Sequence, residues 1–356
     1  MRSGGGPGWR ASAGALLAAL AIGCDIPTEA PVIESRWFVP VDGDTIPVAD
    51  LLPADVTVQD GLFRINVAPV TASRTLGQLC AACVPAEGTT IPKPAFTGVV
   101  TATVPLPATV ASAVTGPGGL VSIRLEHNLT FDPLRPGATA RGQVTIAIRA
   151  GTVVLGTLTI DGATTAFPAG TPLVRTVPLA AGVTVTGAAT VEATIASPAG
   201  DPALILNARS VSMTATPQPV TATEANVQVR DEPVSTGPNA LDVSGVSDDI
   251  VSRATGAVAE AVLANPLAVG GPVTIRFQQG GTDLIAPKQV QVSGGDETVA
   301  VTLTQDETRT LLTAGSVALS SSGTFSGTGG GNVTRVTPTD QVEVRPRLVL
   351  TLRFGE

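Results

Sequence analysis

Three cysteines carry most of the chemistry that this chain could perform. Cys24 ends the apolar run "ALLAALAIGC", whereas Cys80 and Cys83 form a C-x-x-C pair in "QLCAACVP". A thiol can be acylated, can bind a metal or can form a disulfide bond. The residues around each cysteine decide between these uses.

The N-terminal residues are typical of an export signal. Arg2 and Arg10 form a positively charged region that precedes an apolar stretch over 11–23. As a helix this stretch spans only about 20 Å, short of the roughly 30 Å core of a bilayer, so a signal peptide is expected at 1–23 rather than a membrane-spanning helix. No later segment is long and apolar enough to span a bilayer.

The end of this stretch, Ala21-Ile22-Gly23-Cys24, resembles the lipobox of bacterial lipoproteins, although the family usually has Leu where Ala21 stands. The resemblance implies that the sulfur of Cys24 receives a diacylglycerol with palmitate-type chains and that Cys24 becomes the new N-terminus. Residues 24–36 would then form a tether rich in proline and acids. The alternative is ordinary cleavage before Ile22, after Ala19-Leu20-Ala21, which would release the protein.

We therefore expect an exported lipoprotein of the bacterial cell envelope, held to a membrane through Cys24. Two acyl chains hold a protein stably where one is marginal. Asp25 follows the cysteine, a residue that in some lipoprotein systems marks retention at the inner membrane. Since that rule varies among bacteria, the choice of membrane stays open.

The remaining pair, Cys80 and Cys83, is expected to form a structural disulfide in an oxidising compartment. Haem attachment needs a histidine where Val84 stands, and zinc needs further ligands in a chain whose only histidine is His127. A redox role for the pair stays open as an alternative, although nothing nearby predicts the βαβ unit of a thioredoxin-like site.

The sequence offers no other catalytic set. His127 stands between Glu126 and Asn128 and is expected to face solvent or to cap a turn. There is no G-x-S-x-G motif, no calcium loop of defined spacing and no phosphate-binding loop before a helix. We expect no enzyme activity, no cofactor and no metal.

Composition predicts an all-β protein without nucleic-acid partners. The 356 residues include 39 Gly and 29 Pro, which punctuate short runs of Val, Thr and Ile, and the net charge is −8. Such a charge lacks the basic footprint that phosphates need. Asp-Gly pairs at 42–43, 60–61 and 161–162 predict tight hairpins, two of them in an N-terminal hairpin segment over 37–94.

A long-range repeat indicates that one β-domain is duplicated. "VSIRLEHN" begins at Val121 and "VAEAVLAN" at Val258, and "GQVTI" at Gly142 matches "GPVTI" at Gly271. We expect two tandem β-sandwich domains over 95–230 and 245–356, joined by a linker over 231–244. The repeat also favours a short helical turn at 248–254 followed by a strand at 257–265, and a second short helix is expected at 305–315.

The Asn-Pro-Leu at 265–267, between a strand and "GPVTIRF", resembles the LEA type 2 (water-stress) family, whose members are small β-sandwiches. The resemblance implies a sandwich and no catalytic residues. The leading hypothesis is a lipid-anchored, non-enzymatic binding or assembly module with an unknown envelope protein as its partner. The alternatives are a carrier or sensor of an apolar ligand held between sheets, and a thiol redox protein.

Overall fold

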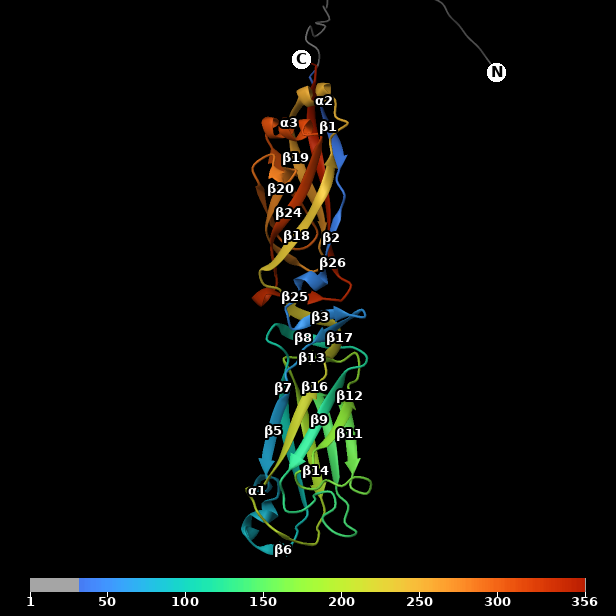
Figure 1. The fold of residues 1–356 in the computed structure, drawn as a ribbon, viewed down its shortest axis with the longest axis vertical. Helices are drawn as coiled ribbons and strands as arrows, with labels where there is room; N and C mark the ends of the chain where they lie inside the picture. Colours follow the sequence, from blue (N-terminus) through green and yellow to red (C-terminus); the bar gives the residue numbers. More distant parts are fainter. Residues whose placement is uncertain (1–31, 356) are drawn as a thin grey trace, which may run out of the picture.

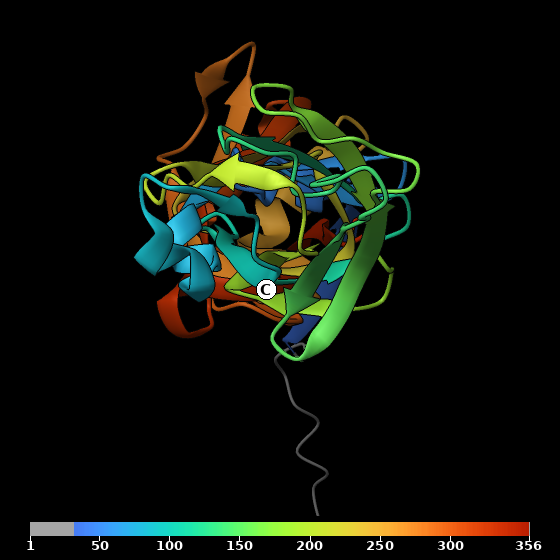
Figure 2. The same cartoon turned by 90° about the horizontal axis from the view of Figure 1, so that it is seen from below.

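The fold is all-β, as the composition predicts. The computed structural model describes residues 32–355, in which long antiparallel strands form an upper and a lower group (Figures 1 and 2). Short alternating runs such as that of β7 (Phe96–Pro105), in which every second residue is buried, place one face of each sheet in a core. The predicted signal peptide, Cys24 and the first part of the expected tether lie outside the described residues.

The lower group is a sandwich of two four-stranded sheets. One has the order β12-β9-β16-β5 and the other β11-β10-β14-β7. The strands not yet given are β5 (Val70–Thr75), β9 (Leu120–His127), β10 (Gln143–Ala150), β11 (Val153–Asp161), β12 (Leu173–Pro178), β14 (Ala188–Ser197) and β16 (Ser210–Pro217). We call it the first sandwich.

The upper group, the second sandwich, repeats this arrangement. One sheet has the order β1-β26-β19-β23, with β2 also on β26, and the other runs β18-β24-β20, with β21 and β22 both on β20. The strands are β1 (Ile33–Pro40), β2 (Asp44–Pro47), β18 (Glu232–Asp242), β19 (Ala254–Ala264), β20 (Val269–Gln279), β21 (Thr282–Asp283), β22 (Lys288–Val292), β23 (Glu297–Leu303), β24 (Ser316–Gly327) and β26 (Gln341–Phe354).

The two sandwiches share one topology, which supports the duplication. Taken in chain order, corresponding strands of the two sandwiches lie in corresponding sheets and have the same neighbours. This is the strand order of an eight-stranded jelly roll. β9 corresponds to β19 and β10 to β20, so "GQVTI" and "GPVTI" occupy equivalent strands. The counterpart of β26 is β16, and β17 (Val220–Gln228), which follows β16, belongs to neither sandwich.

The sandwiches are nested in the chain. β1 and β2 precede the first sandwich but pair with β26 at the other end of the sequence, with Ile33 opposite Phe354. Residues 37–94, expected to be a separate hairpin segment, instead contribute strands to both sandwiches and to the sheet between them. The expected linker 231–244 contains the edge strand β18, whose pairing with β24 satisfies its backbone.

Only one of the three Asp-Gly hairpins forms. Asp60 and Gly61 both have positive φ, at 54° and 71°, and join β3 (Val56–Gln59) to β4 (Leu62–Ile65). At 42–43 the chain continues along β26 without reversing, and Gly162 leads into a loop toward β12 in the other sheet. The glycine there lies close to the backbone of Leu134 and Gly142, where no side chain fits.

Both predicted short helices form, at the outer end of the second sandwich (Figure 1). α2 (Asp248–Arg253) leads directly into β19, and α3 (Gln305–Thr313) precedes β24. α3 begins at a capping box in which Thr304 Oγ1 accepts from the Glu307 backbone N–H at 3.2 Å, while the Glu307 carboxylate accepts from the Thr304 N–H at 2.9 Å.

A sheet between the sandwiches connects them. It has the order β13-β8-β17-β4-β3. A further strand, β25, which lies between β24 and β26 in the chain, also pairs with β17. Arg335 on β25 donates two hydrogen bonds of 2.6 Å to Glu224 on β17, and one cluster of buried apolar side chains continues from the first sandwich into the second. The strands not yet given are β8 (Val110–Thr115), β13 (Thr184–Thr186) and β25 (Val333–Val336).

Candidate functional site

Four long loops meet at the end of the first sandwich that is farthest from the second (Figure 1). They cover residues 76–95, 128–142, 162–172 and 198–209 and contain α1 (Leu76–Leu79) and the two-stranded sheet of β6 (Thr90–Pro92) and β15 (Pro202–Leu204). The hydrogen bonds described below connect these loops to one another. We call this surface the loop end.

His127 lies beneath the loop end and is buried, so the expectation that it faces solvent was wrong, whereas the turn-capping alternative was right. Its Nδ1 accepts from the Leu129 backbone N–H at 3.1 Å, and its Nε2 lies 2.6 Å from the Phe167 carbonyl oxygen. These partners fit the neutral ring with the proton on Nε2. Burial lowers the pKa of His127, against smaller opposing effects of Phe167 and Asp132.

The carboxylate of Asp132 organises the same loops. Its Oδ1 accepts from the N–H groups of Leu134 and Arg135 at 2.7 and 3.1 Å, and its Oδ2 accepts from the Phe167 N–H at 2.7 Å. Arg135 in turn donates from Nε to the Gly162 carbonyl oxygen at 2.7 Å. These loops are therefore fixed to one another by buried and half-buried polar contacts.

Lys93 is fully buried beside the loop end. Its Nζ donates to the Pro198 carbonyl oxygen at 2.5 Å and lies 4.7 Å and 5.3 Å from the ring centres of Phe96 and Phe131. Burial lowers the pKa of Lys93 to about 8. The aromatic faces and one carbonyl thus replace water around a charged amine. Apart from the scarcity of lysine, nothing in the sequence pointed to this site.

Cys80 and Cys83 are brought together next to α1, at disulfide distance, with their Cα atoms 5.3 Å apart. Both are buried, at 1 % and 0 % exposure. Exchange with a thiol requires access to a sulfur atom, so this environment favours the structural use of the pair over the redox use.

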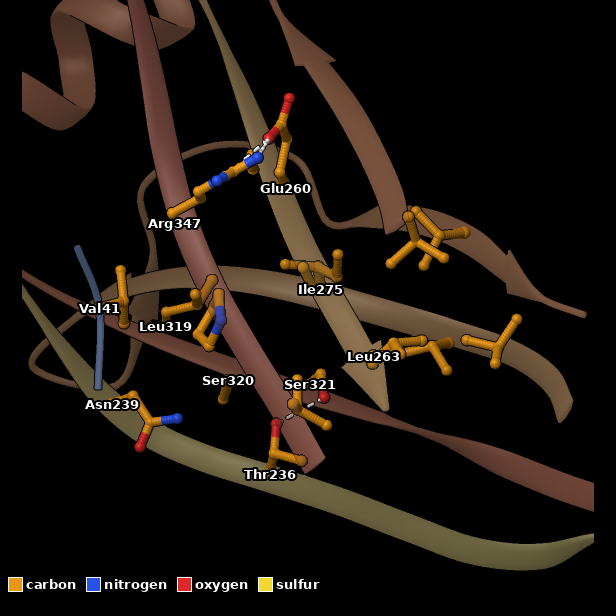
Figure 3. A pocket seen from close by; sticks show the side chains of 18 of the residues that line it. Val41, Thr236, Asn239, Glu260, Leu263, Ile275, Leu319, Ser320, Ser321 and Arg347 are labelled. Carbon is orange, nitrogen blue, oxygen red and sulfur yellow. Dashed lines mark hydrogen bonds and ion pairs between the residues drawn. The ribbon is translucent and has the colours of Figure 1, made fainter. Parts of the chain in front are cut away.

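A crevice lies between the sheets of the second sandwich (Figure 3). Its walls are mostly apolar and include Leu263, Ile275 and Leu319, while on one side Thr236 and Ser321 face each other with their hydroxyl oxygens 2.7 Å apart. The free volume is about 70 Å³, and a comparable gap in the first sandwich holds about 40 Å³. Pockets for drug-sized ligands measure roughly 300–1,000 Å³.

Smaller side chains in the second sandwich account for this crevice. When β9 and β19 are aligned so that Leu125 matches Leu263, Ala261 on β19 stands at the inward-facing position that Ile123 occupies on β9. On the opposite sheet, the pairing of β10 with β14 and of β20 with β24 places Gly323 where the first sandwich has Ile195. The change from isoleucine to alanine leaves space that the surrounding residues fill only in part, whereas at Gly323 the carbonyl group of Pro272 on β20 takes the place of a side chain.

Other kinds of site find little support. Within residues 32–355 no group of three or more His, Cys, Asp or Glu side chains is placed to hold a metal ion. No helix in the same residues has the length and apolar character needed to cross a membrane. Cys24, the predicted lipidation site, lies outside this range.

The comparisons with known proteins give distant structural likenesses. No known protein family matches the chain, and no curated protein matches it. The crystal structure of a "putative secreted protein" from Parabacteroides distasonis is 10 % identical with a TM-score of 0.33, covering 89 % of this chain and 99 % of that one. A chain in the cryo-EM structure of Broad bean stain virus is 12 % identical with a TM-score of 0.20, and the match covers 85 % of this chain and 92 % of that one. At these scores neither likeness bears on function.

Proposed function

We propose that this chain is a lipid-anchored protein of the bacterial cell envelope that acts as a non-enzymatic binding or assembly module, presenting its loop end to a partner protein. The supporting observation is the placement of the two ends. Ile33, the start of β1, lies beside Phe354 at one extremity, and the loop end lies at the other (Figure 1).

This arrangement suits an anchored module because the sheet between the sandwiches joins them through strands. Contacts made at the loop end would be held away from the tether by two sandwiches in series. The loop end also exposes apolar side chains, Val84 at 51 % and Leu204 at 40 %, on loops fixed by Asp132, His127 and Lys93. Apolar side chains on a rigid frame are common in protein-binding surfaces.

The cores support a module more than a carrier. Gaps of about 70 and 40 Å³ leave no room for an acyl chain without separation of the sheets. The buried C-x-x-C pair gives no access for a redox partner. We keep the carrier as the alternative that is tested below.

The first test is the mass of the mature N-terminal peptide, together with membrane fractionation, for wild type and Cys24→Ala. A diacylated Cys24 terminus that is lost, with membrane attachment, in the variant would support the anchor. An unmodified terminus at Ile22 would instead mean a released protein.

The second test places a photo-crosslinking amino acid at Val84 on the loop end and, as a matched control, at the exposed Val174 on β12. Both side chains are about half exposed, at 51 % and 47 %. A partner crosslinked in intact cells from position 84 and not from position 174 is expected. Equal crosslinking from both positions would contradict a specific loop-end interface.

A further inference from the structure

Strand β1 exposes an unusual amount of apolar surface at the tethered end of the molecule. Phe38 is 61 % exposed and Trp37 45 %, and upstream Ile33 is 58 % and Val32 49 % exposed. They lie within seven consecutive residues, whereas single exposed apolar side chains elsewhere on a protein surface are ordinary. Such a concentration of exposed apolar side chains on one strand requires an explanation.

These side chains lie on a free edge. Among the strands within residues 32–355, β1 pairs with β26 on one side and has no neighbour on the other. Because successive side chains point to opposite faces of a sheet, Trp37 and Phe38 project to the two sides of this edge. Natural proteins usually protect such edges with charge, proline or a covering segment. β1 carries two exposed charges, Glu34 and Arg36, and has a proline just before it and at its end, but no described strand covers it.

The distance to the predicted anchor is short. Seven residues lie between Cys24 and Val32, so the span is at most about 28 Å even when the chain is fully extended. Trp37 lies five residues further along β1, about 17 Å on. A diacylated Cys24 therefore keeps the whole strand within reach of the membrane surface.

The chemistry of the exposed side chains on β1 matches the interface of a bilayer. Tryptophan and phenylalanine partition to the headgroup region, and arginine pairs with phosphate. The Arg347 guanidinium lies 5.3 Å from the ring centre of Phe38, and Arg253 lies 5.0 Å from that of Phe354, the strand partner of Ile33. Each arginine also pairs with an acid, Glu260 or Asp249, so that a phosphate would add to or exchange with that ion pair. The free N–H and C=O groups of β1 need water or headgroups as partners, which limits the depth to the headgroup region.

From these observations we infer that the free edge of β1 rests on the lipid surface, so that the anchored protein leans with Trp37 and Phe38 among the headgroups. The inference rests on the proposed acylation of Cys24. A second copy is a poorer occupant, because antiparallel pairing of two β1 edges would point the two loop ends in opposite directions. Two such copies could not both present a loop end away from one membrane.

The experiment uses Trp37 as its probe. The chain has two tryptophans, Trp9 and Trp37, and Trp9 is removed with the signal peptide. The acylated mature protein is reconstituted in vesicles of phosphatidylcholine and phosphatidylglycerol, with or without brominated acyl chains, and the fluorescence is recorded. We expect bromolipid to quench Trp37 and vesicles to shield it from acrylamide.

Two variants make the result specific. Phe38→Ser, which removes an exposed side chain, is expected to reduce the bromolipid quenching by about half. Val174→Ser removes a similarly exposed side chain from the first sandwich and should leave the quenching unchanged. Thermal unfolding followed by circular dichroism checks that both variants remain folded.

The outcomes separate this inference from the anchor on which it rests. An acylated protein that attaches to vesicles while Trp37 stays unquenched and open to acrylamide would overturn the inference and leave the anchor intact. Shielding from acrylamide without bromolipid quenching would also overturn it, since a protein would then cover the edge. A terminus without acyl chains refutes the anchor itself, whatever Trp37 does.

Discussion

His127 and Asn265 occupy equivalent positions at the ends of β9 and β19, and each uses a buried side chain to close the loop that follows. His127 Nδ1 accepts from the Leu129 N–H at 3.1 Å, and Asn265 Nδ2 donates to the Val269 carbonyl oxygen at 2.7 Å. Two residues further on, each loop inserts a buried leucine, Leu129 or Leu267. The duplicated sandwiches thus share a polar side chain that fixes a loop from below.

His127 should make the protein sensitive to mild acid. Burial lowers its pKa in the folded state, so below about pH 6.5 the unfolded chain binds a proton that the folded chain does not. The free energy of unfolding therefore falls as the pH drops from 7 toward 5. Urea unfolding at several pH values measures this slope. His127→Asn, which imitates the second sandwich, should flatten it, because the chain has no other histidine.

Lys93 should produce a slope of the same sign in alkali. Its folded pKa of about 8 lies below the ordinary 10.5, so between these values the unfolded chain binds more protons and unfolding becomes more costly as the pH rises. The gain across this window is about 3 kcal/mol. Lys93→Met should remove the gain. The chain has no tyrosine and only one other lysine, Lys288, so Lys288→Met is the control and should keep it.

The disulfide between Cys80 and Cys83 should contribute modestly to stability. It closes a very short loop, for which the chain-entropy model gives about 2 kcal/mol. Cys80→Ala with Cys83→Ala should lower the free energy of unfolding by about this amount and leave the circular dichroism spectrum unchanged. When the native wild type is treated with dithiothreitol and the reductant is removed, Ellman's reagent should detect no thiol from Cys80 or Cys83 without denaturant. Rapid reduction under native conditions would instead revive the redox alternative.

Filling the crevice of the second sandwich tests the carrier hypothesis. Ala261→Val adds two methyl groups to a gap of about 70 Å³ and should raise the free energy of unfolding by about 1 kcal/mol. Ala264→Val, at the end of the same strand, is the matched control. Saturable binding of a fluorescent fatty acid to wild type that Ala261→Val abolishes would favour the carrier over the module.

The sequence predicted the class of fold and the short helices α2 and α3, because alternation and capping are local signals. It missed the nesting, since nothing local reveals that β1 pairs with β26 more than 300 residues away. It also placed the repeat one residue off. Asn128 was matched with Asn265, but the buried counterpart of Asn265 is His127, and a slip of one residue exchanges the two faces of a strand.

The loop end was harder to foresee. Lys93, Asp132 and Phe167 stand in separate loops of unremarkable composition, and only the folded sheets bring them together. Burial of Lys93 also contradicts the ordinary preference of lysine for solvent. The C-x-x-C pair was found from its spacing alone, because four consecutive residues need no tertiary information to meet.

The pairing of β1 with β26 has a mechanical consequence. If the tether is fixed to a membrane and a partner pulls on the loop end, the tension enters the second sandwich along the axis of β1. The backbone hydrogen bonds to β26 are perpendicular to that axis, so a pull loads all eight residue pairs from Ile33–Phe354 to Pro40–Arg347 together rather than opening them one by one. The strand that leaves the tether is thus held in shear, the geometry that best resists force.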